Sequence, residues 1–285
     1  MSTFTNKVDF AVIFSVKNAN PNGDPLNGNR PRENYEGYGE VSDVCIKRKI
    51  RNRFIDMGQN VFVQSDDKNV DGFKSLNDRA DSIPELKAAD KDKDKNKYAK
   101  VACEKWLDVR TFGQVFAFKK ASKGDGVSVG VRGPVSIHTA VSIEKIDISS
   151  MQITKSVNSE TKDSKSSDTM GMKHRVDSAV YVTYGSINHE LAEKTGFTDE
   201  DATLVKEALI TLFENDASAA RPEGSMEVCK VIWWQHNCFA GQYSSAKVHR
   251  SLKIIPKVDS PKSIMDYDIK VEALEGLKVE IYEGI

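Results

Sequence analysis

The order of the hydrophobic repeats along this 285-residue chain limits the folds it can adopt. Apolar residues alternate, as in a strand with one buried face, over residues 8–16, 131–148, 178–187 and 227–235. They recur with the period of a helix over residues 42–57 and from Thr198 onward. The segments therefore follow the order strand, helix, strand, strand, helix, strand. This order predicts an α+β fold with a ferredoxin-like, split βαβ sheet of the kind that RNA-recognition (RRM) modules use.

The segments between these repeats predict large insertions in that fold. We expect one domain to be assembled from residues 1–58, 127–149 and 176–237. Residues 59–126 lack a single strong period and form one insertion, and the polar residues 150–175 form a second. Residues 238–285 form a C-terminal extension that packs on the sheet, with possible strands at 251–258 and 277–282.

The repeats also predict the faces of the strands. By alternation, one face of residues 131–148 carries Val135, Ile137, Thr139, Val141 and Ile143. In the last strand, Trp233 and Trp234 point to opposite faces, so at least one of them belongs to the core. The other is a second core residue, a surface that stacks on RNA, or a subunit contact, and the core position is favoured.

The two helices are predicted with their ends. Ser42 is a suitable N-cap for the first helix and Gly58 a suitable stop. Its buried stripe is Ile46, Ile50, Phe54 and Met57, and that of the second helix is Ala202, Val205, Leu209 and Leu212.

Charge and cysteine content exclude some classes of protein. Lys and Arg total 41 and Asp and Glu total 42, so the net charge of −1 does not by itself indicate a nucleic-acid binder. No apolar run approaches the roughly 18 residues of a membrane span. The polar residues 1–7 are unlike a secretory signal, and the four cysteines include no Cys-x-x-Cys pair. We therefore expect a cytoplasmic protein with reduced thiols and no membrane contact.

Candidate catalytic and metal-binding groups are few. The sequence contains no His-Glu-x-x-His, Gly-x-Ser-x-Gly or P-loop motif, so we predict no catalytic residue, metal or cofactor. Cys229, His236 and Cys238 are a conceivable zinc group, but they lack a fourth ligand and a known spacing. Asp24 is the best lone acid for metal-assisted RNA cleavage, although its neighbours favour a turn former.

Basic residues on the first helix are candidates for binding a nucleic-acid backbone. Lys47, Arg48 and Arg51 lie close together on the helix surface and can neutralise phosphates; an ordinary solvated helix face, or contact with an acidic partner protein, remains open. In the second insertion, apolar Met170 and Met172 precede Lys173 and His174. Such a hairpin can wedge between bases, although methionines that pack on their own strands are favoured by composition alone.

Five motifs in order resemble the backbone subunit of type I CRISPR surveillance complexes, the Cas7 family, in its type I-C branch. They are NPNGDP at 20–25, VSDVCIKRKIR at 41–51, DVRTFG at 108–113, RGPVSI at 132–137 and NDASAARP at 215–222. The resemblance implies an RRM-like palm with a finger at residues 59–126 and a thumb at residues 150–175. It also implies a chain that is not a catalyst, whereas type III relatives cut RNA with a loop aspartate, for which Asp24 is the alternative here.

The resemblance further implies the partners. Copies of the chain stack head to tail along one CRISPR RNA, as an open helical filament, and each thumb kinks the guide. The exposed bases pair with target DNA, while a cap subunit of the Cas5 type, a large subunit and a small subunit complete the Cascade particle. The protein then reads the backbone and base pairing reads the sequence. The implied RNA-binding residues are Asn20, Asn22, Gly23, Lys47, Arg48, Arg51, Met170, Met172, Lys173 and His174.

Overall fold

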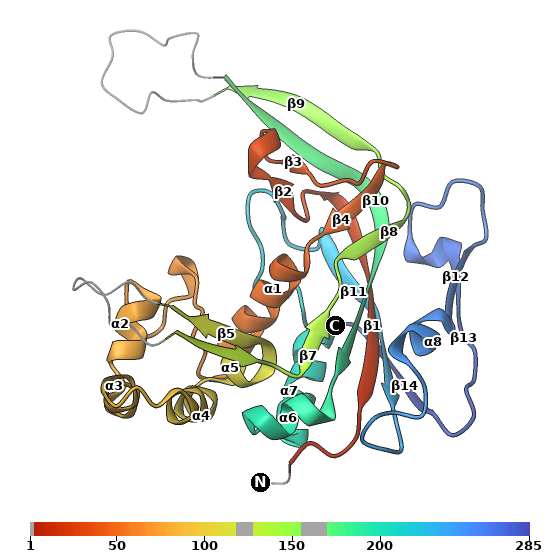
Figure 1. The fold of residues 1–285 in the computed structure, drawn as a ribbon. Helices are drawn as coiled ribbons and strands as arrows, with labels where there is room; N and C mark the ends of the chain where they lie inside the picture. Colours follow the sequence, from red (N-terminus) through yellow and green to blue (C-terminus); the bar gives the residue numbers. More distant parts are fainter. Residues whose placement is uncertain (1–2, 118–127, 155–169) are drawn as a thin grey trace, which may run out of the picture.

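A central antiparallel sheet organises the mixed α/β fold of the computed structural model, which describes residues 3–117, 128–154 and 170–285. The sheet order is β14–β11–β1–β10–β8–β4, and β7 and β9 also pair with β10 (Figure 1). The strands are β1 (Val8–Ala19), β4 (Tyr38–Val41), β7 (Val135–Ile137), β8 (Ala140–Lys145), β9 (Ile148–Thr154), β10 (Met170–Ile187), β11 (Met226–Gln235) and β14 (Lys278–Glu283).

Helices cover one face of this sheet and form the first core. They are α1 (Asp43–Asp56), α6 (His189–Thr195) and α7 (Asp199–Ile210). Ser42 caps α1 by accepting a hydrogen bond from the Cys45 amide, as the sequence predicts. The alternate residues of β1 and the stripe of α7 meet in this core, which confirms both predicted faces; its members include Val8, Phe10, Val12, Phe14, Val16, Ile46, Ile50, Phe54, Ala202, Val205, Leu209 and Leu212.

The C-terminal segment covers the other face and forms the second core. It contains α8 (Ser245–Arg250), β12 (Leu252–Pro256), the short turn η3 (Ile264–Asp266) and β13 (Tyr267–Val271). Trp233 lies in the first core and Trp234 in the second, where Val248 and Leu252 also lie. Because both faces are covered, both tryptophans are core residues, and this confirms the favoured alternative.

The predicted face of residues 131–148 is wrong beyond Ile137. Ile137 pairs with Gly185, but Val141 pairs with Val182, so the β7–β8 side contains one extra residue. A one-residue shift turns every later side chain to the opposite face. Val135, Ile137 and Ala140 therefore lie in the first core, whereas Ile143 packs against the second.

Residues 59–117 and 128–132 form a helical region with a core of its own. Its elements are η2 (Asp66–Lys68), α2 (Leu76–Asp81), α3 (Pro84–Lys91), α4 (Lys95–Lys105), α5 (Leu107–Phe112) and the ribbon of β5 (Gly113–Phe116) and β6 (Val129–Arg132). Phe62, Leu86, Tyr98, Trp106 and Phe116 are buried together there. Arg110 of α5 makes a bidentate ion pair with Asp201 of α7, which joins this region to the first core.

Two ribbons extend from the end of the sheet at which β1 finishes. The short ribbon contains β2 (Gly23–Asp24), η1 (Pro25–Asn27) and β3 (Arg30–Pro31). The long ribbon, formed by β9 and the first residues of β10, projects beyond the sheet at the top of Figure 1. Within the described ranges, no helix is long and apolar enough to cross a membrane.

Candidate nucleic-acid interface

Four segments that are distant in sequence meet where β1 ends (Figure 1). The Lys17 amide donates to the Ser225 carbonyl at 2.8 Å, and the Asn20 amide donates to the Ala220 carbonyl at 2.9 Å. Arg30 Nη1 donates to Ser150 Oγ at 3.2 Å, which joins the short ribbon to β9. The Ser42 amide at the start of α1 donates to Asn22 Oδ1, so the end of β1, residues 220–225, β9 and the start of α1 lie at one end of the sheet.

Asn20, Asn22 and Gly23 lie in the early loop, which runs from the end of β1 to β3, and they hold its shape. Asn20 is buried and its Nδ2 donates to the Asn29 carbonyl at 2.7 Å. Asn22 Oδ1 accepts from both the amide and the hydroxyl of Ser42, at 3.0 and 2.9 Å, so the loop is fixed to the N-cap of α1. A Cβ at Gly23 would lie 2.9 Å from the backbone oxygen of Asn29, so a side chain does not fit there. Their contact with RNA stays a prediction.

Asp24 has the contacts of a turn former. Its Oδ1 accepts from the Leu26 amide at 3.2 Å and lies 3.4 Å from Arg32 Nη2. Across the described residues, no group of three or more His, Cys, Asp or Glu side chains is arranged to hold a metal ion. The carboxylate therefore serves the loop locally.

The three predicted basic residues of α1 differ in their exposure and in their carboxylate partners. Lys47 pairs with Asp43 at 3.0 Å within the helix. Arg48 is the most exposed of the three, with 59% of its side chain accessible, and its Nη2 lies 3.4 Å from Asp67 Oδ1. Arg51 is only 14% accessible, because its guanidinium pairs with the fully buried Asp108 at 2.9 Å. Arg48 is therefore the cation of this helix that is best placed for an external anion.

Asp108 also explains why Arg51 turns inward. One carboxylate oxygen accepts from the Phe62 amide at 2.6 Å and the other from the Val63 amide at 3.1 Å. The Arg51 guanidinium lies 5.1 Å from the centre of the Phe112 ring. These contacts join α1 to the helical region.

A cationic cluster that the predicted site residues do not include lies beside Arg48. Lys49 is almost fully buried and pairs with Asp216, and Arg221 Nε pairs with the same carboxylate oxygen at 3.0 Å. Burial lowers the pKa of Lys49, and the charge of Asp216 opposes that effect. The signal for this cluster is the motif at residues 215–222, which contains both Asp216 and Arg221.

These residues border a pocket with a volume of about 270 Å³ between α1, η2 and residues 215–221. Cys45 lines it and its Sγ donates to the Pro21 carbonyl at 3.9 Å, so the pocket adjoins the base of the early loop. The remaining walls include Arg48, Lys49, Asp67, Ser218 and Arg221.

The long ribbon separates the predicted thumb residues. Met172 pairs with Gln152, Lys173 with Met151 and His174 with Ser150, so Met170, Met172 and His174 share one face and Lys173 lies on the other. Ser150 Oγ lies 2.7 Å from His174 Nδ1 and accepts from Arg30, which turns this face toward the short ribbon. Met170 and Met172 are more than half exposed. Residues 155–169 of the predicted thumb lie outside the described residues.

The conceivable zinc group is not assembled. His236 Nε2 lies 2.8 Å from Asp9 Oδ2, and its Nδ1 accepts from the Gln242 amide at 3.1 Å, so both ring nitrogens have protein partners. Burial raises the pKa of the Cys229 thiol to about 11, as expected for a small hydrophobic core residue.

Comparison with known proteins gives the family. A curated CRISPR-associated protein Cas7 from Haloferax volcanii is 27% identical over 125 residues, which cover 43% of this chain and 36% of that protein. The alignment thus spans about a third of that relative's length. A solved chain from a "CRISPR RNA-guided surveillance complex, pre-nicking" is similar, with 16% identity and a TM-score of 0.46 over 80% of this chain and 78% of that one. A second, from a "CRISPR RNA-guided surveillance complex", has 17% identity and a TM-score of 0.45 over 80% of this chain and 69% of that one. The family model for CRISPR-associated protein Cas7 matches residues 6–272, and the chain therefore belongs to the Cas7 family.

Proposed function

We propose that this chain binds CRISPR RNA as a backbone subunit of a Cascade-like surveillance complex. The observation that carries the proposal is its membership of the Cas7 family over residues 6–272. The structure adds a physical reason: Arg48 and Arg221 line one pocket beside the base of the early loop, although the whole chain is nearly neutral. Local cations are what a protein needs to hold phosphates, because counterion release supplies sequence-independent affinity.

The palm of this subunit is, in our proposal, a ferredoxin-like, RRM-like sheet assembled from residues 1–58, 127–149 and 176–237. The strand order β11–β1–β10–β8, with α1 and α7 against one face, supports it. The separate core of the helical region supports a finger at residues 59–126. The long ribbon supports a thumb at 150–175, and the second core supports a C-terminal extension at 238–285 that packs on the palm.

The finer proposal is a type I-C subunit that stacks head to tail and leaves the guide bases free for target DNA. The long ribbon supports this, because it exposes apolar side chains on both faces: Met170 and Met172 on one, Met151 and Ile153 on the other. A ribbon with exposed apolar side chains on both faces is suited to lie between two partners. The Cas5-type cap, large subunit and small subunit are the further partners proposed.

Coexpression with a CRISPR transcript tests the proposal. Particle mass and the ratio of absorbance at 260 and 280 nm should rise together when the transcript is present. A chain that stays monomeric and free of RNA beside its cognate transcript would overturn the proposal.

The role of Asp24 distinguishes this function from that of a metal-dependent RNA endonuclease. We propose a subunit without catalysis, because the Asp24 carboxylate is already used by Leu26 and Arg32. Labelled RNA should stay intact with Mg²⁺ or Mn²⁺, for the chain and for Asp24→Asn alike. Cleavage that the Asp24→Asn change abolishes would establish the endonuclease instead.

A further inference from the structure

The pocket beside α1 has the size and charge of an anion site. Its volume of about 270 Å³ is close to the lower end of typical small-molecule pockets. Three cationic side chains line it, those of Arg48, Lys49 and Arg221, against two carboxylates, those of Asp67 and Asp216. The walls therefore have an excess of positive charge.

The two carboxylates of the pocket have different roles. Asp216 is only 14% accessible and uses one oxygen for both Lys49 and Arg221. Two cations on one carboxylate leave a net positive charge, and the Arg221 Nη atoms make no hydrogen bond to any described residue. A phosphate oxygen matches these donors in charge and geometry.

Asp67, by contrast, is only weakly paired with Arg48. Its side chain is 70% accessible and its contact with Arg48 is a single long one, at 3.4 Å. Exposed pairs of this kind contribute little, because water and salt compete for both partners. Arg48 can therefore exchange this carboxylate for another anion at small cost.

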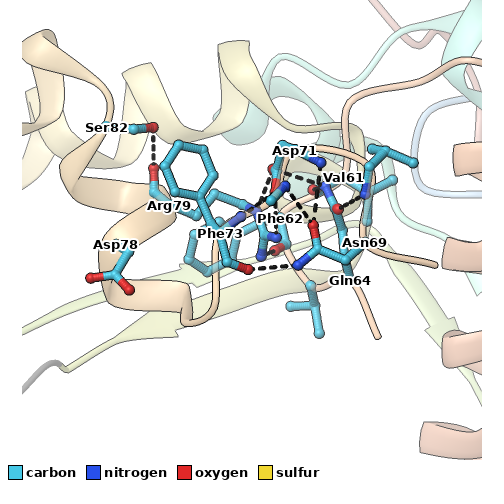
Figure 2. A network of polar contacts seen from close by, with 12 residues as sticks. Val61, Phe62, Gln64, Asn69, Asp71, Phe73, Asp78, Arg79 and Ser82 are labelled. Atoms are coloured by element: carbon cyan, nitrogen blue, oxygen red, sulfur yellow. Dashed lines mark hydrogen bonds and ion pairs between the residues drawn. The ribbon is translucent and has the colours of Figure 1, made fainter. Parts of the chain in front are cut away.

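The backbone on the C-terminal side of Asp67 is firmly held (Figure 2). Arg79 makes a bidentate pair with Asp71 at 2.6 and 2.8 Å and donates to the Phe62 carbonyl at 2.8 Å. Asn69 Nδ2 donates to the Phe73 carbonyl at 2.6 Å. Since these contacts do not involve Asp67, its side chain can leave Arg48 without disturbing them.

We propose that this pocket binds one phosphodiester of the guide RNA, and that Arg48 exchanges Asp67 for that phosphate. Arg221 holds the phosphate from the wall formed by residues 215–221, the buried Lys49 adds its positive charge behind Asp216, and Asp67 acts as a competing anion that weakens binding. This inference deepens the proposed function and rests on it.

A neutral variant of Asp67 gives the sharpest test. Asp67→Asn should bind single-stranded RNA about two- to fivefold more tightly at about 100 mM salt, the range over which an exposed ion pair matters. Asp66→Asn is the matched control, because it removes the same charge one residue away, from a side chain that does not line the pocket. Filter binding with labelled RNA measures both. If Asp67→Asn binds no more tightly than Asp66→Asn, or binds more weakly, the exchange is refuted.

Two further variants test the exchange itself. In a chain that carries Arg48→Gln, the gain in RNA affinity from Asp67→Asn should fall to the gain from Asp66→Asn, because Asp67 then has no arginine to occupy. Arg221→Gln should weaken RNA binding about tenfold and reduce the slope of affinity against salt. A full gain without Arg48, or an unchanged slope without Arg221, would contradict the assignment.

Inorganic pyrophosphate separates this inference from the proposed function. The RNA-free chain should show a higher melting temperature with millimolar pyrophosphate, and the increase should be lost in Arg221→Gln. If the chain binds no RNA but this difference persists, the proposed function fails and the anion pocket stands. If it binds RNA but Arg221→Gln changes neither readout, the pocket fails and the function stands.

Discussion

Two groups of cations on α1 differ in their surroundings although they are neighbours in sequence. Lys49 and Arg51 are 4% and 14% accessible and pair with Asp216 and Asp108. Lys47 and Arg48 are 23% and 59% accessible and pair with Asp43 and Asp67. In the first group the carboxylate partners are themselves largely buried; in the second they lie in solvent.

The cations of α1 therefore have two different roles, which depend on how deeply each side chain is buried. A buried ion pair cannot lose one partner cheaply, because the remaining charge has no water to solvate it. An exposed pair exchanges partners at little cost. The buried cations fix α1 to its neighbours, and the exposed ones are left for a ligand.

Asp108→Ala should have the largest effect on stability. It leaves the Arg51 guanidinium and the amides of Phe62 and Val63 without their acceptor. We expect the free energy of unfolding in urea to fall by about 3–5 kcal/mol. The double variant Asp108→Ala with Arg51→Met should recover part of that loss, because the uncompensated charge is gone. A loss below about 1 kcal/mol in the single variant would show that burial does not decide the role of Arg51.

Asp108 also shows what the sequence can and cannot predict about the site. Lys47, Arg48 and Arg51 can be found from their spacing on one helix, but Asp108 follows Arg51 by 57 positions and Asp216 follows Lys49 by 167. Local spacing contains no information about such partners. The sequence therefore places cations on α1 without showing which of them are free.

The fold follows the same rule. β1, α1 and α7 are predictable because each presents a long, one-sided apolar repeat to the same core. The helices α2 and α3 have six and eight residues and bury only two side chains each, too few to establish a period. Their only local signals are the Ser75 cap and the proline at the start of α3. The shift after Ile137 depends on pairing with β10, which alternation within one strand cannot reveal.

Removing Asp216 and removing Lys49 should lower the free energy of unfolding by different amounts. Asp216→Ala leaves two cations facing each other, one of them buried, and should lower the free energy of unfolding by about 3 kcal/mol. Lys49→Met keeps the Arg221–Asp216 pair and replaces a buried ammonium by an apolar group, so its loss should be about 1 kcal/mol or less. Urea unfolding of both variants checks this order. Equal losses would mean that Arg221 does not support Asp216.

The ion-pair network around Glu280 on β14 is partly exposed, so it lies between the buried and the exposed pairs of α1. Its contribution to the free energy of unfolding should depend on pH. Lys278 and Tyr282 donate to Glu280, Lys206 adds to them, and together they lower the pKa of Glu280 to about 2. Its unfolded pKa is near 4.3, so the stabilisation is full above that pH and is lost as the pH falls toward 2. The difference in unfolding free energy between the chain and Glu280→Gln should be at most about 1 kcal/mol at pH 6 and should shrink at pH 3. A difference that grows on acidification would reverse the assigned sign.

Arg48→Gln should have the smallest effect on folding and still change binding. Its exposed contact with Asp67 predicts a change in unfolding free energy within about 0.5 kcal/mol. Its place in the pocket predicts weaker RNA binding that is uniform across guide sequences, because a phosphate contact does not read bases. Binding to several RNAs of equal length and different sequence measures this, with Lys87→Gln, an exposed lysine of α3, as the control for charge. A loss that varies with the bases would mean that Arg48 reads the guide, and a large loss of stability would place it with the buried cations.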